Sequence, residues 1–135
     1  MSTTVAIPSK LFRAMRKDEA GRPVCGSAGS MLGVRPNVDI PNDGTGAVKP
    51  GTGGLSITPD DPAHLPPHVR PPRLGGKGRL PIFEILRGAI GSSLTFRADP
   101  DHPVTHGFVE PAKVMVLADY QLALCNTGSS WKEVP

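Results

Sequence analysis

The sequence predicts an α+β domain built from short strands and few helices. Gly and Pro number 16 each among 135 residues, hydrophobic residues make up 38% of the chain, and the apolar runs are short. Gly and Pro break helix interiors, so their abundance excludes a helical bundle or a coiled coil. Apolar runs nevertheless survive between them, and the length suits one core, so we expect a single domain over residues 1–135.

Alternation of apolar and other residues predicts the strands. We expect the first strand over residues 9–16, with Arg13 between the apolar Leu11 and Met15 on one face. A tight turn is expected at residues 42–46, where Asn, Asp and Gly tolerate positive φ. Further short strands are expected over residues 38–40, 55–58, 82–85, 94–97 and 105–113.

One helix is expected over residues 117–126, and Gly128 is expected to end it. Its apolar stripe consists of Leu117, Tyr120, Ala123 and Leu124.

Residues 59–81 form a Pro/Gly-rich segment that resembles a linker. One helical turn is expected near residues 62–65, capped by Asp60. Between Arg70 and Arg79 the segment carries basic residues and no acid. We expect either a solvated surface loop or a basic lid that folds over a cleft.

Composition also bears on compartment and partners. No apolar stretch is long enough to cross a bilayer, and residues 1–8 lack the basic residue of a secretory signal. Two cysteines, Cys25 and Cys125, do not make a disulfide framework, which favours the cytoplasm. The net charge of +3 permits an anionic ligand, but the modest charge and sparse aromatic residues argue against nucleic acid.

Common metal and nucleotide motifs are absent from the sequence. His64 and His68, like His102 and His106, have helical spacing for a metal, but proline interrupts both pairs. The string at residues 75–78 lacks the Ser or Thr that must follow the lysine of a phosphate-binding loop. No metal site or dinucleotide fingerprint is therefore expected.

Polar residues within apolar strands are the candidate site residues. Arg13 must meet either an acid, Glu84 or Glu110, or a ligand phosphate, because a buried Arg needs a partner. Ser56 interrupts another strand, as a packed hydroxyl or as a site residue. His106 and Glu110 share a strand face with Phe108 between them, and form either a plain polar row or part of a site.

Several of these residues lie in strings that occur together in one known family. The strings are Leu11-Phe-Arg-Ala14, then Gly53-Gly54 with Ser56, then Thr105-His106 leading to Pro111-Ala112-Lys113 and Met115. In this order they resemble the ADP-ribosyltransferase-fold toxins typified by the second exported effector of type VI secretion. The resemblance implies a small split β-sheet with long Pro/Gly-rich loops and few short helices.

The resemblance also implies roles for individual residues. Arg13 would grip the pyrophosphate of NAD, the substrate, and Ser56 would shape the pocket. Glu110 matches the late catalytic acid of the wider fold. The typifying effector has no acid there but shares the histidine, so His106 is the alternative. A phenyl ring, Phe83 or Phe108, would stack on nicotinamide.

The function that the resemblance implies is that of a bacterial toxin. Such a protein binds NAD and transfers ADP-ribose or cleaves NAD, in the cytoplasm or after delivery into a target-cell cytoplasm. A neutralising antitoxin or immunity protein and a target macromolecule would be its partners, with no membrane. The alternative is a non-catalytic protein-binding module on the same fold, which would use the cleft or the Pro-rich loop.

Overall fold

The structure is a computed structural model that describes residues 9–42 and 44–135. The expectation for residues 1–8 falls outside the described residues, as does Asp43 within the predicted turn at 42–46. Among the residues that the structure describes, no helix is both long and apolar enough to span a bilayer.

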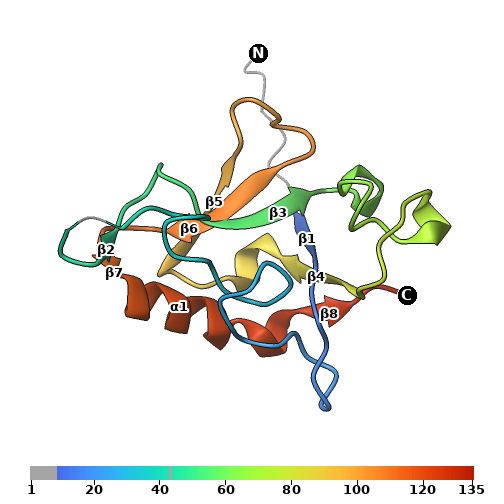
Figure 1. The fold of residues 1–135 in the computed structure, drawn as a ribbon, viewed down its shortest axis with the longest axis horizontal. Coiled ribbons are helices and arrows are strands. Elements are labelled where there is room, and N and C mark those ends of the chain that lie inside the picture. The colour runs from blue at the N-terminus through green and yellow to red at the C-terminus, as the bar shows by residue number, and fades with distance from the viewer. Residues whose placement is uncertain (1–8, 43) are drawn as a thin grey trace.

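Six strands form an antiparallel sheet in the order β5-β6-β3-β1-β4-β8 (Figure 1). Their bounds are Lys10–Ala14 (β1), Leu55–Pro59 (β3), Ile82–Leu86 (β4), Leu94–Ala98 (β5), Gly107–Pro111 (β6) and Lys132–Glu133 (β8). A separate pair joins β2 (Ala47–Val48) to β7 (Met115–Val116), and β7 leads directly into helix α1 (Leu117–Asn126). Short 3-10 turns lie at Pro62–His64, Pro72–Leu74, Arg87–Ala89 and Gly128–Ser130. The predicted α+β class is confirmed.

Strand β1 is buried on both faces because two apolar clusters sandwich the sheet. On one face Leu11 and Met15 belong to the main core, which includes Tyr120 and Leu124 of α1. These two helix residues, with the partly buried Leu117 and Ala123, confirm the predicted apolar stripe. On the other face Phe12, Ala14, Leu65 and Ile82 form a second cluster. Alternation along β1 therefore supplies both cores.

The Pro/Gly-rich segment 59–81 is a covering layer and not a linker. Leu65 is 4% exposed, and Val69 and Leu80 pack against the same second cluster. Because the segment supplies apolar side chains to a core, it is neither a purely solvated loop nor a free lid. The first of its two helical turns, Pro62–His64, begins after Asp61, whose side chain accepts a hydrogen bond from the Ala63 N–H. Asp61, one residue later than expected, is the cap.

Other departures from the sequence prediction are local. Residues 38–40 form a turn with one isolated bridge from Pro36 to Ile40, and not a strand. The two-residue strands β2, β7 and β8 escaped prediction because so short a segment carries no alternation. The remaining predicted strands and the helix are confirmed with shifts at their ends.

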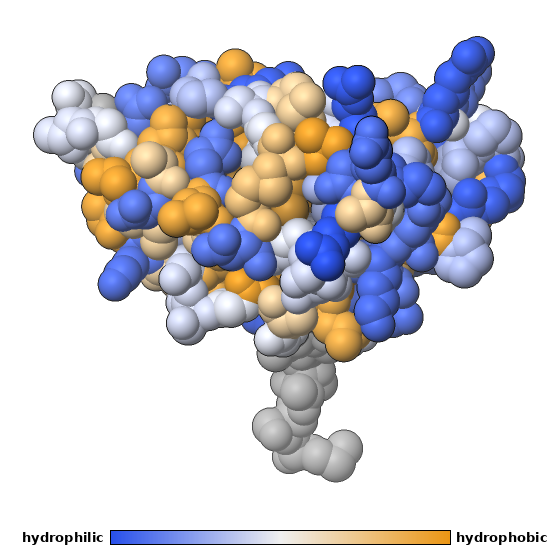
Figure 2. All heavy atoms as spheres, turned by 90° about the horizontal axis from the view of Figure 1, so that it is seen from below, coloured by the Kyte–Doolittle hydropathy of each residue, from blue (hydrophilic) through white to orange (hydrophobic). Residues whose placement is uncertain are grey.

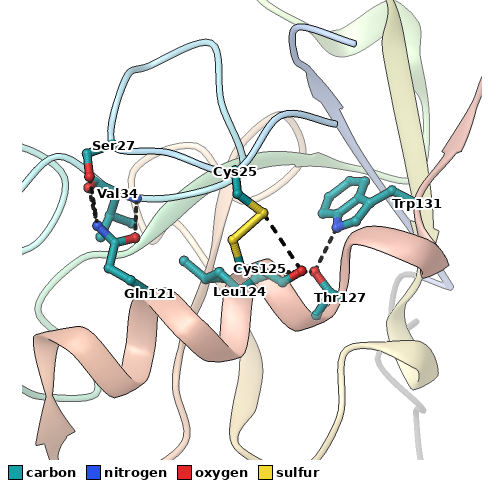
Figure 3. The surroundings of a disulfide bond; sticks show 8 residues. All are labelled: Cys25, Ser27, Val34, Gln121, Leu124, Cys125, Thr127 and Trp131. Atoms are coloured by element: carbon teal, nitrogen blue, oxygen red, sulfur yellow. Dashed lines mark hydrogen bonds between the residues drawn. A yellow bond between two sulfur atoms is a disulfide. The ribbon is translucent and has the colours of Figure 1, made fainter. Parts of the chain in front are cut away.

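A disulfide joins Cys25 to Cys125, a pair separated by 100 residues (Figure 3). It fastens the loop after β1 to the last turn of α1. Gln121 reinforces the attachment, because its side chain both accepts from the Val34 N–H and donates to the Val34 carbonyl. The sequence favoured no disulfide framework and did not reveal this single bond. Distance in sequence says nothing about distance in the fold, and here the two Cα atoms lie 5.6 Å apart.

The surface below the sheet mixes apolar and charged groups. Figure 2, seen from below the view of Figure 1, shows hydrophobic residues in several patches that hydrophilic residues separate. Exposed apolar residues near the start of α1 include Val114, Val116 and Leu122.

Candidate functional site

The site lies where β1 and β3 separate. These strands pair only through Leu11 with Pro59 and Phe12 with Thr58, whereas β1 pairs with β4 over its whole length. Beyond Phe12 the Arg13 guanidinium takes the place of the missing ladder and donates from Nη1 to the Ser56 carbonyl at 2.8 Å. The β1–β3 ladder therefore stops at Phe12 within one continuous six-stranded sheet, and this point where the two strands diverge is called the split below.

Arg13 is bound to backbone carbonyls and not to an acid. It also donates to the Gly29 carbonyl at 2.9 Å and, from two nitrogens, to the Met31 carbonyl. The side chain is 8% exposed. Burial lowers its pKa to about 10, with nearby Asp39 opposing the shift, so the group stays protonated at neutral pH.

The two carboxylates considered as partners of Arg13 are bound elsewhere. Glu84 pairs with Lys10, and Glu110 pairs with Arg97. From the sequence we expected Arg13 to bind an acid or a ligand phosphate. In the structure it binds backbone carbonyls instead, most of them from a distant loop. Arg13 is thereby a structural clamp between β1, β3 and the loop that carries Gly29.

A cavity of about 250 Å³ opens at this split. It brings together three of the predicted residues: Arg13 of β1, Ser56 of β3, and His106, which directly precedes β6. Its polar lining includes Arg13, Arg35, Asp39, Ser56, Thr58 and His106.

Asp39 is a site residue that the sequence analysis missed. Gly53 and Gly54 have φ of 147° and 146°, a region that favours glycine. A Cβ on Gly53 would overlap the Asp39 carbonyl oxygen, and the Gly54 N–H donates to that oxygen at 2.9 Å. The paired glycines therefore place Asp39 beside β3, and they were the signal in the sequence.

The Asp39 carboxylate is held ionised on the cavity wall. Burial raises its pKa, but hydrogen bonds from the Arg35 side chain and backbone N–H, with the charges of Arg35 and Arg13, outweigh that effect. The pKa of Asp39 consequently lies below its ordinary value. The Arg35 Nη2 atom is 2.9 Å from Asp39 Oδ1, and Arg35 Nε is 3.1 Å from Oδ2.

One ring nitrogen of His106 is hydrogen-bonded to a carboxylate. Its Nδ1 atom lies 2.7 Å from Asp99 Oδ2, and this hydrogen bond lowers the pKa of Asp99. Because an ionised carboxylate accepts, Nδ1 is the donor, and in the neutral ring Nε2 has the lone pair. The Phe108 ring meets the imidazole edge-on, with centroids 4.8 Å apart. A carboxylate so placed orients the ring.

Glu110 does not reach this cavity. It is 4% exposed and accepts from the Gly51 N–H at 2.8 Å and from Arg97 Nε at 2.9 Å. It is absent from the cavity lining. We expected Glu110 to share a strand face with His106. Its hydrogen bonds with the Gly51 N–H and Arg97 instead make it a structural residue that holds the loop before β3.

The two phenyl rings proposed to stack on nicotinamide have different surroundings. Phe83 is 0% exposed within the main core and does not line this cavity, so the structure does not bring it to the site. Phe108 is half-buried between His106 and Arg97, whose Cζ lies 4.7 Å from the ring centroid. Phe108 thus supports His106 from the side.

The hollow beside helix α1 lacks the predicted residues. It measures about 520 Å³ and is lined by Lys113, Asp119 and Asn126 among others, and by none of the candidate residues. Within residues 9–42 and 44–135, no group of three or more His, Cys, Asp or Glu side chains is arranged to hold a metal ion.

No protein-family model, no curated protein and no solved structure matches the chain. The case for a function therefore rests on the chemistry of the cavity at the split.

Proposed function

We propose that the chain binds NAD and cleaves its nicotinamide–ribose bond, passing ADP-ribose to an acceptor or to water, on an ADP-ribosyltransferase-like fold. One observation carries the proposal: Arg13, Ser56 and His106, which lie far apart in the sequence, line one cavity at the split between β1 and β3. The resemblance implies a split sheet and these residues at its pocket.

Asp39 takes the electrostatic role that the sequence analysis gave to Glu110. When the bond between ribose C1′ and nicotinamide nitrogen breaks, its electron pair goes to nicotinamide and positive charge develops on the ribose. A carboxylate near that ribose stabilises the charge, as in glycoside hydrolysis. Asp39 is the ionised carboxylate in the cavity wall.

His106 acts as the base for the incoming nucleophile. A hydroxyl or water attacks C1′ and passes its proton to Nε2, while Asp99 stabilises the imidazolium through Nδ1. The Ser56 hydroxyl, at the same cavity, supplies a donor and an acceptor for the nicotinamide amide. Arg13 shapes the pocket by holding its walls.

The toxin role follows from this chemistry, because loss of NAD or modification of a target macromolecule harms a cell. A neutralising antitoxin or immunity protein is the matching partner. The Cys25–Cys125 disulfide suits a protein that passes through an oxidising compartment. It favours delivery into a target-cell cytoplasm over permanent cytoplasmic residence.

The test is release of nicotinamide from NAD by the purified chain, measured by chromatography. Asp39→Asn and His106→Ala are expected to lower the rate at least about 100-fold, the size of effect seen for other preorganised charge stabilisers. Asp119→Asn, an exposed acid in the other hollow, is the matched control and should act like wild type. Melting curves establish that each variant is folded. Absence of nicotinamide release from NAD by the wild-type chain would refute the proposal.

A second candidate is the non-catalytic protein-binding module. Capture of Glu110 by Arg97 and Gly51 favours it, since the acid matched to the wider fold is unavailable. On this hypothesis the chain, induced in a bacterium, would affect growth equally with and without His106→Ala, and NAD would not be consumed.

A further inference from the structure

A second cavity lies against the first and has a different character. It measures about 520 Å³ and shares Leu65, Pro66 and His106 with the cavity at the split. Its other lining residues include His64, Arg70, His102 and Thr105. Each of its titratable lining residues is basic, and no carboxylate is among them. Asp99, the nearby acid, is already bound to His106 Nδ1.

Arg70 is fixed in this cavity by the tightly wound loop around it. Its backbone N–H donates to the Pro66 carbonyl, and its carbonyl accepts from the Gly78 N–H at 2.7 Å. A Cβ on Gly76 would overlap the Arg70 carbonyl oxygen, and a Cβ on Gly78 would overlap the carbonyl oxygen of Val69. The glycines of residues 75–78, which form no phosphate-binding loop, thus hold Arg70 in place.

The Arg70 guanidinium is anchored but has donors to spare. Nη1 donates to the Ala63 carbonyl at 2.9 Å, which sets the plane of the group. Nε is buried and has no hydrogen-bond partner. An unsatisfied buried donor is unfavourable, and its presence beside a cavity calls for an explanation. A bound anion that draws the Arg70 guanidinium toward the cavity would explain this unpaired donor.

Arg13 is poorly placed to be the anion contact that the resemblance implies, because four of its five N–H groups already donate to carbonyls. Its Nε, Nη1 and Nη2 atoms all donate to carbonyls of Ser56, Gly29 and Met31. A ligand that spans both cavities must place its negative charge where cationic donors are free. Guanidinium groups match phosphate oxygens in a bidentate way.

We propose that the second cavity is a phosphate site, with Arg70 as its main contact and His64 and His102 at its edge. This rests on the proposed function in one respect, that the ligand spanning both cavities is a dinucleotide. Its diphosphate would lie at Arg70, while its nicotinamide end enters the smaller cavity. The 59–81 segment then acts as a built wall of the site.

Calorimetry with three probes tests the site: ADP-ribose, inorganic pyrophosphate and the phosphate-free nicotinamide riboside. Arg70→Gln is expected to weaken ADP-ribose and pyrophosphate binding about tenfold, and to leave nicotinamide riboside binding unchanged. Arg73→Gln is the matched control, because Arg73 is exposed on the same loop and lines neither cavity. ADP-ribose binding tighter than pyrophosphate would identify a nucleotide diphosphate; equal affinities would identify free phosphate.

Unchanged ADP-ribose binding in Arg70→Gln, or an equal loss in Arg73→Gln, would overturn the proposal in favour of general charge attraction. If Arg70→Gln fails to fold, wild type provides the measurement: pyrophosphate must slow phenylglyoxal modification of Arg70 and not of Arg73. Nicotinamide release separates the two proposals. Pyrophosphate binding that depends on Arg70, without NAD cleavage, would support the phosphate site and refute the proposed function. NAD cleavage that Arg70→Gln leaves unchanged would support the proposed function and refute the phosphate site.

Discussion

Replacing Arg13 by alanine should destabilise the fold before it affects any ligand. The guanidinium joins β1 to the Ser56 carbonyl of β3 and to the Gly29 and Met31 carbonyls of the loop. Without it, these three carbonyls at the split lose a charged donor. The alanine also leaves a void in the gap between β1 and β3.

The size of the effect follows from two opposing quantities. Removal of one partner from a buried charged interaction costs about 3–5 kcal/mol. Burial of the guanidinium is itself unfavourable, as its pKa of about 10 indicates, and the variant no longer bears that cost. We therefore expect the lower part of the range, a loss of about 3 kcal/mol in the free energy of unfolding and a fall of roughly 10 °C in Tm.

Urea unfolding monitored by fluorescence measures this directly. Trp131 is the single tryptophan and is 4% exposed in the main core, so its emission reports global unfolding. Arg16→Ala, which replaces an exposed arginine three residues along the chain, is the control and should lose less than about 0.5 kcal/mol. If Arg13→Ala stays within about 1 kcal/mol of wild type yet loses NAD binding, Arg13 faces the ligand and the clamp hypothesis is wrong.

Three further perturbations have expected outcomes. The double variant Cys25→Ser/Cys125→Ser should lose about 2–4 kcal/mol in urea unfolding, because the bond closes a long loop; no loss would mean that the loop ends stay together without it. Gly53→Ala should lower Tm and nicotinamide release together, since its Cβ would displace the Asp39 carbonyl; an unchanged Tm would contradict that contact. The lowered pKa of Asp39 gives stability that is full above its ordinary value of 3.8 and is lost as pH falls through the folded-state value. Asp39→Asn should therefore flatten the acid limb of stability against pH, and an unaltered limb would refute the Arg35 pairing.

Sequence periodicity predicted the secondary structure and the buried faces, which depend on residues close together in the chain. The alternation of Leu11, Arg13 and Met15 identified both the strand and its buried arginine, and the stripe through Tyr120 and Leu124 identified the helix. Periodicity places a side chain on a face but does not name what that face meets. The carbonyl partners of Arg13 lie in a turn-rich loop without any period, so the sequence offered no route to them.

The same limit explains why the site was only partly foreseen. Ser56 and His106 were candidates because each interrupts an apolar strand, and both line the cavity. Asp39 was missed because its predicted strand suggested an ordinary alternating residue, whereas it lies in a turn. Glu110 was favoured because it shares a face with His106, but Arg97 on β5 competes for it. Charge pairing across strands depends on strand order, which periodicity does not give.

The high glycine content allows close backbone approaches around both cavities. Gly53 admits the Asp39 carbonyl, and Gly76 admits that of Arg70, at approaches that any side chain would block. Each contact fixes a charged residue at one of the two adjoining cavities. A helix-rich chain would present such residues from rigid cylinders, whereas here loops wound tightly on themselves do so. Substitution of these glycines should therefore disturb the cavities more than substitution of Gly88, which has open space around its Cα.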